Sequence, residues 1–322
     1  MKKMVNRALA AVLCLWLLPG GVHAAEMLIP VGQVVGLELS NRTVSVAGFD
    51  DSLGGCAREA GLQIGDEIID IDGIAIDDAE DVRHALERSD GRVELRILRE
   101  DEERQLCLTP EITSDGPRLG VYLRQGITGI GTVTWYDPDS GRFGTLGHGV
   151  SNKNGDLVQM TGGKVYAANV LSVKRGKVGQ PGQLCGSVVS AQAMGNIEKN
   201  TVQGVFGSMV TGWEGEALEI AEKNQVCVGA ATIRSTISGD AVQEYSVEIL
   251  KIYPKSTAEG RNMLIRVTDP RLLSTTGGIV QGMSGSPIIQ DGKLVGAVTH
   301  VLVNDPTTGY GIFIENMLDA AA

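Results

Sequence analysis

From residue 119 onward the sequence consists of short apolar runs that glycine interrupts, and this pattern limits the fold more than any other feature. Runs such as Ile130–Tyr136, Val165–Val173 and Leu294–Val303 have the length of strands, and few runs show the three-to-four spacing of a helix. The chain has 43 glycines without a collagen-like period, as expected where many short strands are joined by tight turns. We therefore predict a β-barrel domain here, closed by a helix from Ile314 to Ala320.

The preceding part of the chain, from about residue 26 to 108, mixes strands with one helix. Glu67–Asp72 alternates polar and apolar residues, as a half-buried strand does, and Asp72-Gly73 is a hairpin turn signal. Residues 77–88 carry apolar residues at helical spacing, with Asp78 placed to cap the helix. Two prolines and a glycine then mark 109–118 as a linker.

This small unit resembles a PDZ domain in its bacterial arrangement. The resemblance is carried by residues 57–73, which read AREAGL, two variable residues, GD, one more variable residue, and then I-x-x-IDG. PDZ domains bind an extended peptide as an added strand and hold its carboxylate on backbone N–H groups. The resemblance implies that the peptide-binding loop is formed by Val35, Gly36 and Leu37.

The N-terminal segment has the features of an export signal. Three basic residues precede an apolar run from Ala8 to Leu18, and Val22-His23-Ala24 offers small residues where a signal peptidase cuts. The run is short for a membrane-spanning helix. Residues 1–25 are therefore predicted to be a signal peptide, or a membrane tether if they are not removed, and the protein to be exported.

Charge and cysteine content narrow the possible partners. The formal net charge of −11 argues against nucleic acid, because nothing in the chain neutralises phosphates in bulk. The spacing of the four cysteines beyond the signal gives neither a disulfide framework nor a metal-ligand pattern, and their pairing stays open. These are Cys56, Cys107, Cys185 and Cys227. We expect no metal ion and no organic cofactor.

The segment Gln281–Ile289, which reads QGMSGSPII, has the composition of a nucleophile loop. Glycines on either side of Met283-Ser284 permit close approach by a substrate backbone, and the N–H groups of Gly282 and Ser284 are the candidate oxyanion hole. The stretch resembles the G-x-S-G-[GS]-P loop of chymotrypsin-like peptidases. It differs from the α/β-hydrolase elbow because a strand follows it. Met283 stands where those peptidases usually have aspartate, so the ion pair that activates digestive zymogens cannot form.

A serine nucleophile needs a base, and the best-placed histidine is His148. Gly147 and Gly149 flank it in a predicted loop, which leaves it accessible for proton transfer. His84 falls on the predicted PDZ helix and His300 in a strand. A histidine that precedes the serine in the chain matches the order of the two-barrel peptidases.

The acidic partner of His148 is less defined by the residues themselves. Asp269, which precedes Pro270, is one candidate, and Asp240 and Asp156 are the alternatives. The strand Thr299-His300-Val301 is a candidate edge for pairing with substrate.

The order of these motifs resembles the stage IV sporulation protein B (SpoIVB) peptidase family over residues 27–318. The motifs are the PDZ unit, LGHG at 146–149, TDP at 268–270 and QGMSGSPI at 281–288. The resemblance implies the triad His148, Asp269 and Ser284. It also implies a signalling peptidase made in the forespore and exported to the space between the two spore membranes. Such a peptidase cleaves itself and then a membrane-protein regulator of an intramembrane protease, so that a mother-cell sigma factor is activated.

The predicted protein is thus mainly β, with a PDZ-like α/β module followed by a chymotrypsin-like double β-barrel. The predicted divisions are 1–25 (signal), 27–108 (PDZ), 109–118 (linker) and 119–322 (serine peptidase). Two other functions stay open at this point. One is an envelope quality-control PDZ protease, and the other is a PDZ scaffold that binds peptides without catalysis.

Overall fold

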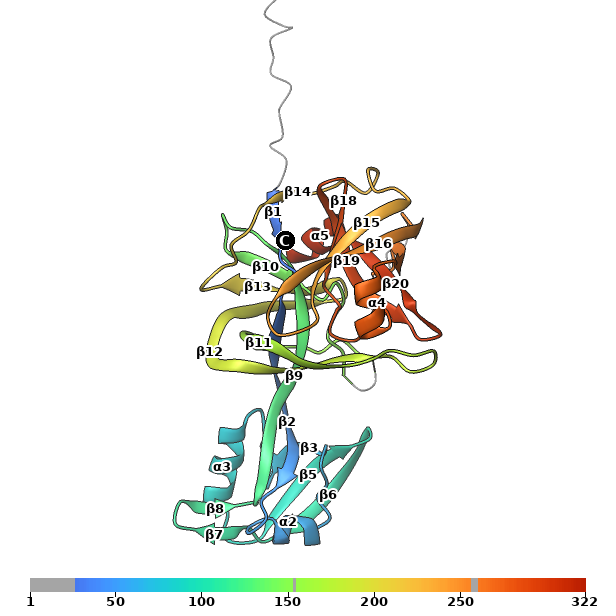
Figure 1. Cartoon of the computed structure of the whole chain (residues 1–322). Helices are drawn as coiled ribbons and strands as arrows, with labels where there is room; N and C mark the ends of the chain where they lie inside the picture. The colour runs from blue at the N-terminus through green and yellow to red at the C-terminus, as the bar shows by residue number, and fades with distance from the viewer. Residues whose placement is uncertain (1–26, 153–154, 256–259) are drawn as a thin grey trace, which may run out of the picture.

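The computed structural model describes residues 27–152, 155–255 and 260–322, so the predicted signal segment lies outside the described residues. Figure 1 shows two β-barrels side by side and a smaller α/β module that two long strands connect to the first barrel. In the part of the chain that the structure describes, no helix is long and apolar enough to span a bilayer. The four described cysteines are unpaired.

The first barrel is a ring of six strands. In ring order they are β2 (Val34–Phe49), β9 (Val121–Tyr136), β10 (Arg142–Thr145), β13 (Gly204–Met209), β12 (Gln183–Thr201) and β11 (Gly162–Lys174). The ring closes because β11 and β9 both pair with the first half of β2. Two short strands, β1 (Met27–Pro30) and β14 (Leu218–Glu219), extend the sheet beside β9. Alternate residues of these strands fill the interior, among them Val35, Phe143 and Val205.

The second barrel is a closed ring of six strands. In ring order they are β15 (Gly229–Thr236), β16 (Val242–Ile252), β17 (Met263–Val267), β20 (Asp305–Phe313), β19 (Lys293–Leu302) and β18 (Pro287–Gln290). Its core includes Ile233, Ile249 and Phe313. A short helix, α4 (Pro270–Thr276), follows β17, and the predicted closing helix forms as α5 (Ile314–Ala321). The predicted double β-barrel is therefore confirmed.

The α/β module has its own apolar core, which includes Val44, Ile71, Leu86 and Leu95. Its own elements are α2 (Gly55–Glu59), β3 (Glu67–Ile71), β4 (Ile74–Ala75), α3 (Ala79–Arg88), β5 (Val93–Arg99), β6 (Glu102–Leu108), β7 (Glu111–Thr113) and β8 (Gly116–Arg118).

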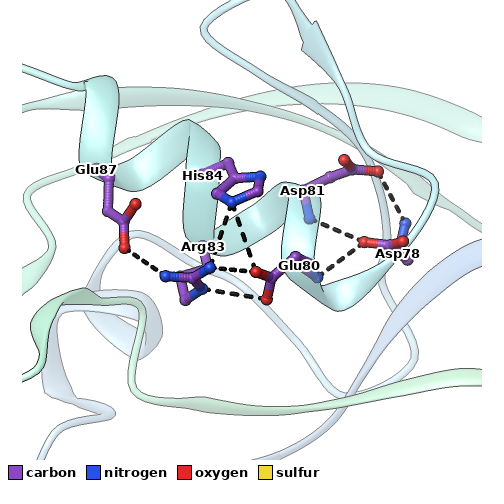
Figure 2. A network of polar contacts seen from close by, with 6 residues as sticks. All are labelled: Asp78, Glu80, Asp81, Arg83, His84 and Glu87. Carbon is purple, nitrogen blue, oxygen red and sulfur yellow. Dashed lines mark hydrogen bonds and ion pairs between the residues drawn. The ribbon is translucent and has the colours of Figure 1, made fainter.

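Helix α3 begins as the sequence predicts. Asp78 accepts hydrogen bonds from the N–H groups of Glu80 and Asp81, and the Asp81 carboxylate accepts one from Asp78 N–H, which completes a capping box (Figure 2). Further along the helix, Arg83 pairs with Glu80 and with Glu87 (Figure 2). These contacts fix one wall of the groove described below.

The module is inserted into the first barrel and does not precede it. The first half of β2 pairs with β11 in the barrel, from Val35↔Ala167 to Ser40↔Gly162. Its second half pairs with β3 in the module. Strand β9 leads back from the module to the barrel: Val121–Leu123 pair with β2 in the module, and Gly129–Thr132 pair with β2 in the barrel.

The domain boundaries predicted from the sequence therefore need correction. Residues 27–39 belong to the peptidase barrel, and the predicted linker 109–118 contains the hairpin of β7 and β8. The physical reason is that β2 and β9, each 16 residues long, contribute one half to the core of the module and the other half to the core of the first barrel. The strands cross closely at Gly126, where φ is +77° and a Cβ would lie 1.9 Å from the carbonyl oxygen of Leu39.

Candidate active site

Ser284 lies in the loop between α4 and β18, where the two barrels meet. Its hydroxyl donates a hydrogen bond of 2.8 Å to the carbonyl oxygen of Thr299 on β19. The next residue, Gly285, has a φ of +97°, and a Cβ there would lie 1.9 Å from the carbonyl oxygen of Thr132. Glycine is therefore required beside the nucleophile, both for its backbone conformation and for the close approach of β9.

Two threonines of β9 hold this loop from the first barrel, and the sequence analysis missed them. The backbone N–H of Thr132 donates to the carbonyl of Ser284 at 3.1 Å, and its hydroxyl donates to the carbonyl of Gly282 at 2.7 Å. Thr134 donates its hydroxyl to the carbonyl of Gly285 at 2.8 Å. Both side chains are buried, so polar residues inside an otherwise apolar strand were the signal that pointed to them.

The N–H groups of the loop divide into satisfied and open donors. Those of Gln281, Met283, Gly285 and Ser286 reach backbone carbonyls at 2.7–3.1 Å. Within the described residues, the N–H groups of Gly282 and Ser284 have no backbone acceptor. These are the two donors that the sequence predicts for the oxyanion hole, and Gly282 has the left-handed φ of +98°.

His148 reaches the same place from the first barrel. It follows β10 in a turn where Leu146 and Gly147 both have a φ of +68°. The imidazole ring lies 5.1 Å, centroid to centroid, from the ring of His300. Since His300 follows Thr299, which accepts the Ser284 hydroxyl, the predicted base and nucleophile contact adjacent residues of β19.

The protonation state of His148 suits a general base. Burial lowers the pKa of its imidazole, because removal from water disfavours the charged form, and a hydrogen bond with the Gly149 carbonyl only partly opposes this. Nδ1 lies 2.9 Å from that carbonyl oxygen. This contact places the proton of the neutral ring on Nδ1 and leaves Nε2 as the acceptor.

Asn200 braces the loop that carries His148. Its amide oxygen accepts from the N–H of Val150 at 2.9 Å, and its NH₂ group donates to the carbonyls of Val150 and Val158. Asn200 is near the turn from β12 to β13, far from His148 in sequence, and no motif marked it. It is a positioning residue for the histidine loop.

In the described arrangement the Ser284 hydroxyl bonds to Thr299 and not to His148. The Ser284 proton is directed at Thr299, and the described residues show no hydrogen bond between Ser284 and His148. Acyl transfer therefore needs the Ser284 hydroxyl to turn from the Thr299 carbonyl toward His148 Nε2. Such hydrogen bonds are commonly long or misaligned before substrate binds.

The structure does not bring Asp269 to His148, so the triad role implied by the resemblance needs correction. The Asp269 carboxylate caps α4 through the N–H of Arg271 at 2.8 Å, pairs with the Arg271 guanidinium, and accepts from the N–H of Ser246. These contacts hold its pKa well below its usual range, with the Arg271 hydrogen bonds as the largest cause.

The position of β17 gives the physical reason. At Gly260, just before β17, an added Cβ would lie 2.9 Å from the carbonyl of Gly147 in the histidine loop. Asp269 follows the other end of the strand, and a five-residue strand extends roughly 15 Å. An aspartate before proline is a common helix start, and Asp269 serves here as the N-cap of α4 and not as the partner of His148. Asp156 and Asp240 are exposed, and neither contacts His148 within the described residues.

We expect Asp269→Asn to act mainly on stability. Loss of the cap and of the partly exposed ion pair should lower the free energy of unfolding by about 1–2 kcal/mol. The kcat of the folded fraction should stay within about tenfold of wild type, because among the described residues no contact links this carboxylate to His148. Thermal denaturation and active-site-titrated kinetics on the same samples measure both. A loss of about 10⁴-fold in kcat at unchanged stability would restore Asp269 to the triad.

The predicted PDZ loop also lies elsewhere. Val35, Gly36 and Leu37 are within the first barrel, paired with β11 on one side and β9 on the other, so they offer no free strand edge. A groove of about 320 Å³ instead lies between α3 and the start of β9. Its lining includes Val82 and Leu86 of α3 and Leu119–Leu123. This is the geometry for strand addition, and the error followed from assigning all of β2 to the module.

The third predicted binding element, Thr299-His300-Val301, lies beside Ser284, and its pairing with substrate stays a prediction. On one side β19 pairs with β20, while its pairing with β18 ends at Ala297. On this second side the backbone of Val298 bonds to Gly285 and Ser286, and the carbonyl of Thr299 accepts the Ser284 hydroxyl. No cluster of histidine, cysteine or acidic side chains suited to a metal ion occurs among residues 27–152, 155–255 and 260–322.

The lowered pKa of His148 predicts the pH dependence of catalysis. The base works only when unprotonated, so kcat/KM should fall as pH drops through its pKa. Because burial lowers that pKa, the fall should be centred below about 6.5, the ordinary value for histidine. A pH profile of kcat/KM measures this, with thermal stability followed at each pH as a control. A rate that stays constant from pH 8 to pH 5, or a midpoint above 6.5, would argue against His148 as the base.

Two six-stranded barrels with a serine loop on one and a histidine loop on the other, meeting at an open pair of N–H donors, define a chymotrypsin-like serine peptidase. Residues 115–318, more than half of the chain, match the SpoIVB peptidase S55 family, and residues 52–99 match a PDZ domain. The chain belongs to the SpoIVB peptidase S55 family and is a serine peptidase with a PDZ domain.

Solved structures of lower similarity include the Rv3671c protease of Mycobacterium tuberculosis. Its inactive form is 15% identical, with 61% of this chain and 85% of that chain covered, at a TM-score of 0.35. Its active form is 16% identical, with 74% and 82% covered, at the same TM-score.

Proposed function

We propose that this chain is an exported regulatory endopeptidase of sporulation signalling that cleaves itself and a membrane-protein regulator of an intramembrane protease. Membership in the SpoIVB family and the N-terminal segment, with its basic start and apolar run, support this proposal. Its place of action is the space between the forespore membranes. Its substrates are extended segments of proteins, including a second copy of the chain itself.

One structural observation carries the link between recognition and cleavage. The groove and the nucleophile loop share strand β9: Val121–Leu123 line the groove, and Thr132 holds Ser284 and Gly282. The two points are nine residues apart, or roughly 30 Å along an extended strand. A protein substrate long enough to occupy both would be held beside Ser284 by its PDZ-bound segment.

Self-cleavage in trans tests the proposal. Labelled Ser284→Ala protein, which cannot cut itself, is incubated with a small amount of unlabelled wild type, and products are followed by mass spectrometry. We expect cleavage at one or a few sites that rises with the amount of wild type. Broad degradation of unfolded protein, together with sparing of the folded Ser284→Ala chain, would instead indicate quality control. An intact substrate at all wild-type concentrations would exclude self-cleavage.

The groove should matter for protein substrates and not for short peptides. Ala79 is exposed at the start of α3 and lines the groove, so Ala79→Trp fills it without disturbing the core. We expect about tenfold slower cleavage of the Ser284→Ala chain and an unchanged rate on a short peptide. Arg88→Trp, on the same helix but outside the groove, is the matched control. Equal effects of the two variants would show that the groove does not guide the substrate.

A further inference from the structure

The tip of the β11–β12 hairpin crosses from the first barrel to the second (Figure 1). We call residues 174–184 the strap. Gly176, Gly182 and Leu184 of the strap are buried, whereas most of its other residues are exposed. The tip itself is a tight turn closed by two backbone hydrogen bonds between Lys177 and Gln180.

The strap is bonded to three parts of the second barrel: the end of α4, the turn after β19, and the nucleophile loop. The N–H of Gly176 donates to the carbonyl of Thr276 at 2.8 Å, and that of Gly179 to the carbonyl of Val303 at 2.9 Å. The Arg175 guanidinium donates to the carbonyls of Leu273 and Ser274, near the C-terminal end of α4. A cation at this end of a helix is also favoured by the helix dipole.

The third part is the nucleophile loop itself. The strap binds both polar groups of the Gln281 backbone: the N–H donates to the carbonyl of Gly182 at 2.9 Å, and the carbonyl accepts from the N–H of Leu184 at 2.8 Å. Gln183 and Gln281 form a parallel bridge between these two bonds. The nucleophile loop therefore pairs with the start of β12 at one residue, Gln281, which directly precedes Gly282, the first oxyanion donor.

Because the peptide bond is planar, the bond between Leu184 and the Gln281 carbonyl also fixes the direction of the Gly282 N–H. The carbonyl of Gln281 and the N–H of Gly282 belong to one trans peptide unit and point in opposite directions. While Leu184 holds the carbonyl toward the strap, the N–H of Gly282 must point away from it. A flip of this peptide would break the Leu184 bond and remove one donor from the oxyanion hole.

We propose that the strap is the positioning device of the oxyanion hole, acting through Gly182 and Leu184 on the peptide between Gln281 and Gly282. This proposal rests on the peptidase activity of Ser284 and concerns how its oxyanion hole is kept in shape. In zymogen-type relatives of the fold an aspartate before the serine does this work through an ion pair. Here that position is the buried Met283, which has no charge to offer. The strap supplies the constraint from outside the loop.

Two variants loosen the strap in different ways. A Cβ at Gly182 would lie 2.5 Å from Gly176 N and 2.6 Å from a methyl group of Val280, so Gly182→Ala pushes the strap away from the loop. Arg175→Ala removes the anchor on α4 without touching buried atoms, which guards against the possibility that the first variant fails to fold. Lys177→Ala is the matched control, because only the backbone of Lys177 takes part in the turn within the described residues.

The readouts separate oxyanion stabilisation from binding and from folding. They are kcat and KM on a short peptide, the rate of Ser284 labelling by a fluorophosphonate, and the affinity for a peptide boronate, whose adduct oxygen occupies the oxyanion hole. Loss of one oxyanion donor costs about 10²- to 10³-fold in kcat. We expect kcat, labelling rate and boronate affinity to fall together, about 100-fold in Gly182→Ala and about tenfold in Arg175→Ala, with KM within about threefold and Lys177→Ala unchanged.

Three results would overturn the proposal. Wild-type labelling rates in both strap variants would show that the strap is dispensable. A loss confined to KM, or one matched by Lys177→Ala, would show that it acts on binding or stability. Failure of the wild type to label at Ser284 would overturn the peptidase assignment itself, and this outcome is distinct from the other two.

Discussion

Replacing Ser284 by alanine is expected to lower kcat on a short peptide by about 10⁵- to 10⁶-fold while the protein stays folded. The loss follows because the Ser284 hydroxyl is the attacking group and lies beside the open N–H groups of Gly282 and Ser284. The variant also loses one hydrogen bond to Thr299, which costs about 1 kcal/mol of folding free energy. Fluorogenic peptide hydrolysis and thermal denaturation measure the two effects.

Ser286 provides the matched control for this variant. It lies two residues away in the same loop, is buried, and its hydroxyl has no hydrogen-bond partner in the described structure. Ser286→Ala should therefore keep activity within about threefold of wild type, since no hydrogen bond is lost. If the two alanine variants lost activity equally, loop disturbance and not the nucleophile would be the cause.

Replacing His148 by glutamine should cost nearly as much, because serine and histidine act as one unit. Glutamine keeps a polar side chain of similar reach but cannot take the proton from Ser284. The double variant Ser284→Ala/His148→Gln should be no slower than the single variants, and this non-additivity is the signature of a shared step. Steady-state kinetics on the four proteins gives the comparison.

His84 offers the corresponding control, since it is exposed on α3 in the PDZ module (Figure 2). His84→Gln should leave peptide hydrolysis unchanged.

His300→Gln is expected to lower kcat by about tenfold, an intermediate effect, because the His300 ring packs on His148 and its loss frees the His148 imidazole to move. A His148→Gln enzyme with near wild-type kcat would mean that another group removes the proton.

The sequence predicted those parts of the site that local patterns define. Glycines around Ser284 and His148 marked loops where backbones approach closely, and the structure shows such an approach at Gly285. The short apolar runs predicted a β-barrel domain, whereas the prediction of two barrels came from the resemblance to chymotrypsin-like peptidases. Local spacing also predicted α3 and its cap at Asp78.

What the sequence missed depends on contacts between distant residues. Thr132, Asn200 and the strap hold the site through bonds that span from 42 (Asn200 to Val158) to 152 residues of sequence (Thr132 to Ser284, 284 − 132), and no short motif records such partners. Each long strand was assigned whole to a single domain, β2 to the PDZ unit and β9 to the peptidase. Both halves of each strand have the ordinary pattern of a strand, so nothing local shows that β2 and β9 contribute to two cores. Asp269 was assigned from a motif whose residues also make an ordinary helix cap.

Ser284 is a nucleophile whose reactivity depends on the folded protein and on His148. The most direct measurement is labelling with a fluorophosphonate at pH 8, followed by peptide mapping of the modified residue. We predict a single adduct on Ser284 in the folded wild type, none after denaturation, and labelling at least 10³-fold slower in His148→Gln. An adduct on a different residue, or labelling of Ser284 at the same rate in His148→Gln, would contradict the account.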